Sequence, residues 1–153
     1  MQRILLLSMT LMLIVAGCKK TVVNEAPGDR QIRFSLPGNI VYDSIYSLTG
    51  EQDNIHKFNI DYYDDVDSVI YSFYSSVQEG NTGTVELYNF TDSIPIAGSL
   101  MHVSRNEAID FYQSGNLKAA FPHKEITLGL RLKGFVQGKF LNAVSGILYL
   151  YRK

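Results

Sequence analysis

Four aspartates, Asp61, Asp64, Asp65 and Asp67, form the densest group of side chains that could carry chemistry. Hard cations such as Ca²⁺ take several carboxylate and carbonyl oxygens from one loop, so a calcium site is one hypothesis for this segment. The segment lacks the turn glycine and the distal bidentate glutamate of an EF-hand. We favour the alternative, a solvated connection between two strands whose charges discourage pairing between sheet edges. No cofactor other than Ca²⁺ is suggested.

The histidines give no sign of a metal or catalytic centre. His56, His102 and His123 lie far apart in the sequence and share no ligand spacing. The chain also has no zinc-hydrolase, phosphate-loop, dinucleotide or nucleophile-elbow motif. A catalytic triad could still assemble from distant residues, because triads are recognised by geometry. The lack of motifs favours a protein that binds rather than catalyses.

Tyrosine is abundant and suggests a second kind of site, because its ring can offer an apolar face to a sugar and its hydroxyl can bond the sugar. Five tyrosines are the best candidates for partial exposure and glycan stacking: Tyr42, Tyr46, Tyr63, Tyr74 and Tyr88. The chain has no tryptophan. Core or sheet-surface roles are therefore expected for most of these tyrosines.

The N-terminus has the layout of an export signal. Arg3 precedes an apolar run, residues 4–15, that is shorter than the roughly 20 residues needed to span a bilayer. The next residues, Val15-Ala16-Gly17-Cys18, resemble the lipobox of bacterial lipoproteins. The resemblance implies that residues 1–17 are removed as a signal peptide. Cys18 would then carry a diacylglyceryl group and, on its new amine, an acyl chain such as palmitate.

Lipid on Cys18 would fix the protein to a membrane leaflet, because two acyl chains suffice for stable anchoring. Cys18 is also the only cysteine, so no disulfide is expected. Lys19 and Lys20 follow it, and the aspartate that retains lipoproteins in the inner membrane of enteric bacteria is absent. We expect the outer membrane, and the sequence leaves the periplasmic or surface side open.

Composition predicts one domain on a tether. Residues 18–31 are expected to be the lipidated N-terminus and a polar, flexible tether, since Pro27-Gly28-Asp29 disfavours regular structure. Residues 32–153 are long enough for a sizeable core. The net charge of −1 gives no reason to expect nucleic acid as a partner. Acids prevail in residues 40–112 and bases in 113–153, so we expect opposite-charge pairs between early and late strands.

Apolar and polar residues alternate along the domain, and a period of two predicts β-strands with one buried face. The clearest segments are residues 32–36, 58–62, 69–77 and 126–132. Residues 147–151 are apolar throughout and are expected to form a central or doubly covered strand. Turn residues lie between these segments at 37–39, 50–54, 80–83, 114–116, 134 and 138. The predicted fold is an all-β, antiparallel sandwich of the jelly-roll kind, with an up-and-down barrel as the alternative.

Residues 104–113 are ambiguous. Ser104 and Glu107 have the spacing of a capping box, and apolar residues follow them. A short helix, an irregular strand and a crossing loop all remain open for this segment.

Several short segments resemble a group of small Bacteroidota lipoproteins with a single jelly-roll-like domain, similar in outline to carbohydrate-binding-module sandwiches. The segments are Leu87-Tyr88-Asn89-Phe90-Thr91-Asp92, Ile94-Pro95-Ile96, Ser114-Gly115-Asn116, Phe121-Pro122, residues 126–131 and the final apolar strand ending in Lys153. The resemblance implies export and a β-sandwich, and a fold alone does not imply an activity.

These observations predict a membrane-anchored, non-enzymatic binding or accessory module of the cell envelope. Its partners would be the membrane, through the Cys18 lipid, and either a glycan or another envelope protein. One alternative is an envelope glycan hydrolase that uses acids among residues 61–67, because most glycosidases work with a pair of carboxyl groups. The other is a structural subunit without a ligand of its own.

Overall fold

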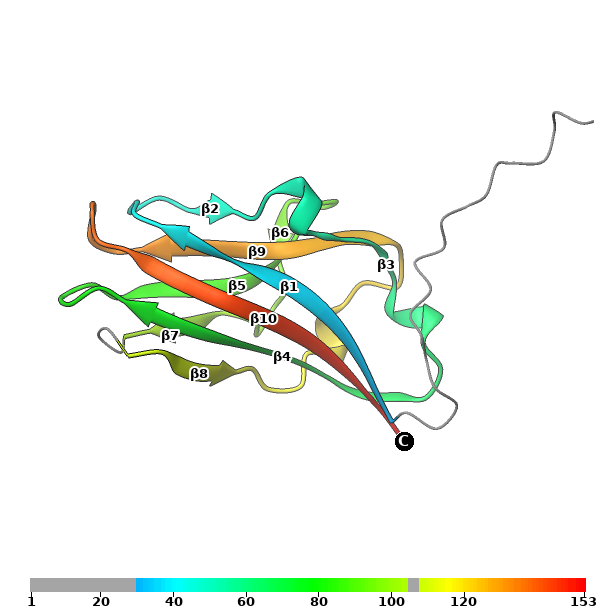
Figure 1. The fold of residues 1–153 in the computed structure, drawn as a ribbon. Helices are drawn as coiled ribbons and strands as arrows, with labels where there is room; N and C mark the ends of the chain where they lie inside the picture. The colour runs from blue at the N-terminus through cyan, green and yellow to red at the C-terminus, as the bar shows by residue number, and fades with distance from the viewer. Residues whose placement is uncertain (1–29, 105–107) are drawn as a thin grey trace, which may run out of the picture.

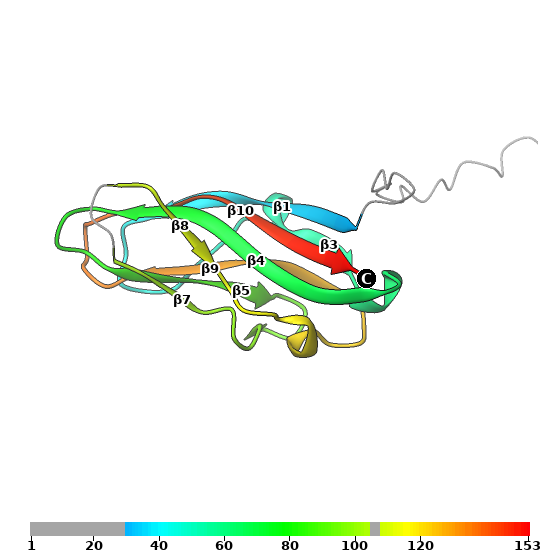
Figure 2. The same ribbon diagram turned by 90° about the horizontal axis from the view of Figure 1, so that it is seen from below.

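Two antiparallel β-sheets packed face to face make up the fold (Figures 1 and 2). The computed structural model describes residues 30–104 and 108–153. The expected signal peptide, Cys18 and residues 19–29 of the tether therefore lie outside the described residues. The first strand begins at Gln31, one residue before the predicted start of the domain at Ile32.

Sheet A has the strand order β1-β10-β4-β8. Its strands are β1 (Gln31–Val41), β10 (Leu141–Arg152), β4 (Val66–Val77) and β8 (Asp110–Gln113). Strand β10 lies between β1 and β4, which confirms the central position predicted for residues 147–151. Leu148 and Leu150 point into the core, whereas Tyr149 and Tyr151 are half-buried on the outer face.

Sheet B has the order β2-β9-β5-β6, with β3 also paired to β9 and β7 to β5. Its strands are β2 (Ser47–Leu48), β3 (Ile55–Phe58), β5 (Gly83–Asn89), β6 (Ile94–Pro95), β7 (Met101–Val103) and β9 (Ile126–Gly134). The central pair, β5 and β9, stays in register from Gly83 opposite Gly134 to Asn89 opposite Leu128.

This strand order is that of a jelly roll. β2 and β3 both pair with β9, and β6 and β7 both pair with β5, so each of these two pairs can be counted as one interrupted strand. Each sheet then has four strands, and the first and last strands of the chain are neighbours in sheet A. A double sheet of eight strands built from two Greek keys has this arrangement. The predicted β-sandwich is confirmed, and the barrel alternative is wrong for the described residues.

The core lies between the sheets and uses the apolar residues that the alternation predicts. The inward side chains of β9 and β4 are at most 2% exposed: Ile126, Leu128, Leu130, Leu132, Val69, Tyr71, Phe73 and Val77. Burial of apolar surface contributes roughly 25 cal/mol per Å². Packing between these two strands and their neighbours therefore holds the sheets together.

Strand β1 continues through Pro37-Gly38-Asn39, where a turn had been predicted, so that prediction is wrong. β1 is an edge strand, and proline is tolerated at an edge because its missing N–H need not pair. A Cβ on Gly38 would lie 1.9 Å from the carbonyl oxygen of Ala143. Glycine is thus required for the close approach of β1 to β10, not for a change of direction.

The strand predicted for residues 58–62 ends early. β3 stops at Phe58, and Ile60–Tyr62 forms a 3₁₀ turn. The side-chain oxygen of Asn59 accepts a hydrogen bond from the amide of Asp61 at 3.1 Å. Such local bonds compete with the sheet ladder and favour a turn.

The helix considered for residues 104–113 is wrong for its second half, because Asp110–Gln113 is strand β8. Residues 105–107 lie outside the described residues. β8 pairs with β4, and Tyr112 stacks on Phe73 with 5.2 Å between ring centroids. Tertiary pairing overrides a weak helical pattern here.

The described chain begins and ends at the same end of the sandwich, which we call the base (Figure 1). The amide of Arg152 donates to the carbonyl of Arg30 at 2.8 Å. The opposite end, the tip, holds the connections β1–β2, β4–β5 and β9–β10. No helix in residues 30–104 or 108–153 is long and apolar enough to cross a membrane.

Candidate functional site

The outer face of sheet B brings together two of the five predicted tyrosines. Tyr46 directly precedes β2 and Tyr88 lies on β5, while Arg131 lies on β9. The guanidinium carbon of Arg131 is 4.1 Å from the centroid of the Tyr46 ring and 4.9 Å from that of the Tyr88 ring. A cation over aromatic faces is attracted to them, so the three side chains hold one another in place. We call them the tyrosine–arginine cluster.

Glu86 fixes the orientation of Arg131. The two residues are opposite one another on β5 and β9. The Arg131 Nε and Nη2 atoms lie 2.8 Å and 2.7 Å from Oε1 of Glu86, whose side chain is 5% exposed. A buried, charge-assisted contact of this kind restrains the arginine. It also confirms, at this position, the predicted pairing of an early acid with a late base.

A row of three polar residues crosses the same face. Lys133 of β9 is opposite Thr84 of β5, and Thr84 is opposite His102 of β7. The Lys133 ammonium lies 5.1 Å from the centroid of the Tyr46 ring. We call these residues the lysine–threonine–histidine row. It adjoins the tyrosine–arginine cluster, because Tyr46 contacts both basic side chains of β9.

The other three predicted tyrosines lie elsewhere. Tyr63 packs at the core margin, with ring centroids 5.6 Å from Phe34 and 6.0 Å from Phe58, so its ring is engaged within the protein. Tyr74 is on the outer face of sheet A, 5.3 Å from the Phe111 ring and 49% exposed. Tyr42 is at the tip. Only Tyr46 and Tyr88, among the five, share a cluster with a cation in the described part of the chain.

The predicted aspartate cluster borders an open hollow at the base. Asp61, Asp64 and Asp65 line it, whereas Asp67 does not. The hollow measures about 760 Å³ and is also lined by cationic or titratable side chains: Lys118, His123 and Lys153. In residues 30–104 and 108–153, no three His, Cys, Asp or Glu side chains form a group that could hold a metal ion. The four predicted aspartates therefore do not come together as such a group there.

The three histidines are all exposed and have separate surroundings. His56 Nε2 lies 3.0 Å from the carbonyl oxygen of Glu51, and His123 Nδ1 lies 2.7 Å from Oδ1 of Asp61. His102 belongs to the row on sheet B. Their placement gives no histidine a nucleophile or a buried carboxylate partner in the contacts of the described residues.

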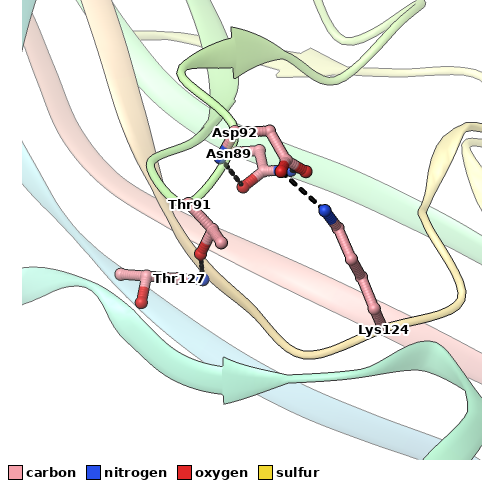
Figure 3. A network of polar contacts seen from close by, with 5 residues as sticks. All are labelled: Asn89, Thr91, Asp92, Lys124 and Thr127. Atoms are coloured by element: carbon pink, nitrogen blue, oxygen red, sulfur yellow. Dashed lines mark hydrogen bonds and ion pairs between the residues drawn. The ribbon is translucent and has the colours of Figure 1, made fainter.

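A polar network at the base fastens the turn after β5 to the segment leading into β9 (Figure 3). Asn89 Nδ2 donates to Asp92 Oδ2 at 2.7 Å, Lys124 Nζ lies 2.6 Å from Asp92 Oδ1, and the amide of Thr127 donates to Thr91 Oγ1 at 2.9 Å. The bonds from Lys124 and Asn89 hold the pKa of Asp92 below its ordinary value. These bonds give Asn89, Thr91 and Asp92 a structural role, because they hold the turn after β5 in place.

Exposed apolar side chains gather at the tip. Those on or beside the β1–β2 and β9–β10 connections are between 38% and 67% exposed: Ile40, Tyr42, Ile45, Phe135 and Val136. The two connections run side by side, since the amide of Gly138 donates to the carbonyl of Tyr42 at 2.8 Å. Exposed apolar side chains that gather on neighbouring connections can mark an interaction site.

Sequence reasoning missed Arg131, Glu86, Lys133 and Thr84 as site residues. Their alternation with apolar residues along the sequence indicates that they face away from the core. It does not show that β9 lies beside β5, or in which register. That pairing joins residues about 45 positions apart, and no local pattern reports it.

No protein-family model matches the chain, and no curated protein matches it either. Among solved structures, it is similar to a chain described as "Bacillus endospore appendages form a novel family of disulfide-linked pili", at 11% identity and a TM-score of 0.39, covering 84% of this chain and 94% of that one. It is also similar to a chain of infectious bursal disease virus, Gx strain, at 8% identity and a TM-score of 0.43, covering 80% of this chain and 32% of that one. Likenesses this weak carry no argument about function.

Proposed function

We propose that this chain is a lipid-anchored, non-catalytic module of the bacterial cell envelope that binds a glycan. Its binding surface is the tyrosine–arginine cluster on sheet B. The observation that carries the proposal is the meeting of Tyr46 and Tyr88, two of the five candidates for glycan stacking, around the guanidinium of Arg131 at 4.1 and 4.9 Å.

The cluster offers the groups that sugar recognition requires. Tyr46 is 47% exposed, so part of its ring is open to the apolar face of a sugar, and its hydroxyl can hydrogen-bond. Arg131 is already held by Glu86 at 2.7 Å. A side chain that is ordered before binding loses little entropy when the ligand arrives, which favours affinity.

The expected lipid anchor would present this surface to the envelope. From Cys18 to Gln31 the chain can span at most about 45 Å when fully extended. β1 begins at the base, whereas the cluster lies on a side face of the sandwich (Figure 1). A glycan can therefore reach the cluster while the base faces the membrane.

The test is a glycan panel against the full-length lipidated protein in detergent micelles. A ligand that binds the native state raises its melting temperature by mass action. We expect Tyr46→Ala to weaken binding of that ligand by about tenfold, as the loss of one aromatic contact predicts. Tyr74→Ala is the matched control, because Tyr74 is 49% exposed on the other sheet.

Two outcomes would contradict the proposal. If Tyr74→Ala reduced binding and Tyr46→Ala did not, the site would lie on sheet A instead. If no glycan class shifted the melting temperature, glycan binding itself would be wrong.

A protein partner is the second candidate function, and the exposed apolar tip favours it. The partner would be another envelope protein that covers Ile45 and Phe135, which are 67% and 46% exposed. Site-specific crosslinking from position 45 in intact cells should then capture one discrete partner, and the Phe135→Ser variant should lose that product. Crosslinks unchanged by Phe135→Ser would exclude the tip as the contact.

A further inference from the structure

The surface around Tyr46 carries a cation without a matching anion. Glu86 forms an ion pair with Arg131, so those two charges offset one another. Lys133 approaches the same ring at 5.1 Å, and no carboxylate of the described residues forms an ion pair with it. The patch therefore has an unbalanced positive charge beside a half-exposed aromatic ring.

An unsatisfied hydroxyl lies in the middle of the lysine–threonine–histidine row. Thr84 is 4% exposed, and its Oγ1 atom has no hydrogen-bond partner among the described residues. Most buried hydroxyls in proteins are hydrogen-bonded, and an unpaired one is unfavourable. Thr84 is flanked across the sheet by Lys133 and His102, so the row offers three groups that can donate to the same acceptor.

We propose that the glycan bound by sheet B is acidic, with its carboxylate or sulfate on the lysine–threonine–histidine row and its sugar ring on Tyr46. This inference rests on the proposed glycan-binding function and names the ligand class. Residues opposite each other on neighbouring strands lie about 5 Å apart, so one anionic group above Thr84 is within reach of both flanking side chains. Lys133 forms no ion pair with a carboxylate of the described residues, and its flexible stem can move aside to admit the anion to Oγ1.

The test measures binding of the full-length lipidated protein in detergent micelles to immobilised polygalacturonate, dextran sulfate and neutral dextran. Polygalacturonate presents carboxylates and dextran sulfate presents sulfates, so the two arms identify the anion. We expect one acidic polymer to bind more tightly than dextran, and the binding to weaken between 0.1 and 1 M salt, where the Debye length falls from about 10 Å to 3 Å.

Single substitutions test whether the acidic polymer binds at the lysine–threonine–histidine row. Lys133→Gln should weaken binding to the acidic polymer by about tenfold, the effect of losing one charge-assisted hydrogen bond. Lys57→Gln, an equal charge change at an exposed residue of β3, should leave binding unchanged. Thr84→Val keeps the side-chain shape, so it should weaken binding without lowering the melting temperature.

Dextran binding that depends on Tyr46 but not on Lys133 would overturn the acidic-ligand inference and leave glycan binding in place. Equal losses in Lys133→Gln and Lys57→Gln would also overturn it, because they would indicate unspecific attraction between charges. If none of the three polymers bound and no glycan of the wider panel raised the melting temperature, both the proposed function and this inference would be wrong.

Discussion

Two parts of the Tyr71 side chain have opposite effects on the stability of the fold. Its ring is fully buried in the core and stacks on Phe73 at 5.4 Å. Its hydroxyl, however, finds no hydrogen-bond partner among the described residues. Burying an unpaired hydroxyl costs about 1–3 kcal/mol, so the ring stabilises the fold and the oxygen does not.

Tyr71→Phe should therefore raise the free energy of unfolding, by about 1 kcal/mol. The change removes only the unsatisfied oxygen and keeps the ring. Urea unfolding at pH 7 measures it, and Tyr74→Phe, at an exposed tyrosine, is the control that should show no gain. A loss of stability in Tyr71→Phe would mean that the hydroxyl has a partner in solution.

The same variant should alter the response to alkali. Burial raises the pKa of Tyr71 far above its ordinary value of 10.0. Because the native state keeps this proton and the unfolded state releases it, stability falls as the pH rises above 10. Tyr71→Phe lacks this loss, so its advantage over the unchanged protein should grow between pH 9 and pH 11 in the same urea experiment. If the difference in the free energy of unfolding between the two proteins stayed constant over this pH range, the raised pKa of Tyr71 would be contradicted.

At the scale of the elements, Asn81 ties two turns of the tip together. Its side-chain nitrogen donates to the carbonyls of Lys139 and Phe140 at 3.0 and 3.1 Å. Its side-chain oxygen accepts from the amides of Phe135 and Val136 at 3.2 and 3.0 Å. One buried amide thus pairs four backbone groups of the β9–β10 connection.

Asn81→Asp should destabilise the protein by about 2–3 kcal/mol, because a carboxylate oxygen would replace the donor that faces two carbonyls. Chemical unfolding measures the loss. Asn142→Asp, at a half-buried residue of the outer face of β10, is the control for adding a charge nearby. Equal effects in the two variants would mean that the four bonds contribute little.

The Asp92 network links two connections at the base and should fail in acid. The pKa of Asp92 is lowered from the ordinary 3.8, because Lys124 and Asn89 bond its charged form. The network therefore stabilises the fold above pH 3.8 and loses this effect as the pH falls through the lowered pKa. Lys124→Ala should therefore destabilise the protein at pH 6, and the difference should shrink as the pH is lowered below 3.8. Thermal melts of both proteins across this range give the comparison, and a pH-independent difference would contradict it.

For the whole molecule, the sequence predicts that Cys18 holds the domain to a membrane. Cys18→Ser should move the protein from the membrane fraction to the soluble fraction, because the lipid attachment site is lost. Because a polar tether is predicted between Cys18 and the domain, the melting temperature of the soluble domain should match that of the lipidated protein. Continued membrane association in Cys18→Ser would contradict lipid anchoring.

The alternation of residue types along each strand is enough to predict which residues lie inside. Leu128, Leu130 and Leu132 alternate with polar neighbours, and each is fully buried in β9. Side-chain direction in a strand is a local property with a period of two, so a local pattern suffices to predict the faces of the sandwich. The lipobox at Cys18 is equally local, and it stays a prediction.

Which strands are neighbours, and in what register they pair, becomes known from the folded structure alone. Pro37-Gly38 stays within β1 because β10 approaches closely, and Asp110–Gln113 is a strand because β4 lies beside it. The candidate site arises in the same way, since Arg131 meets Tyr46 and Tyr88 only when β9 lies between β2 and β5. Pairing between distant strands depends on closing long loops and on filling one common core, and no single segment of sequence contains that information.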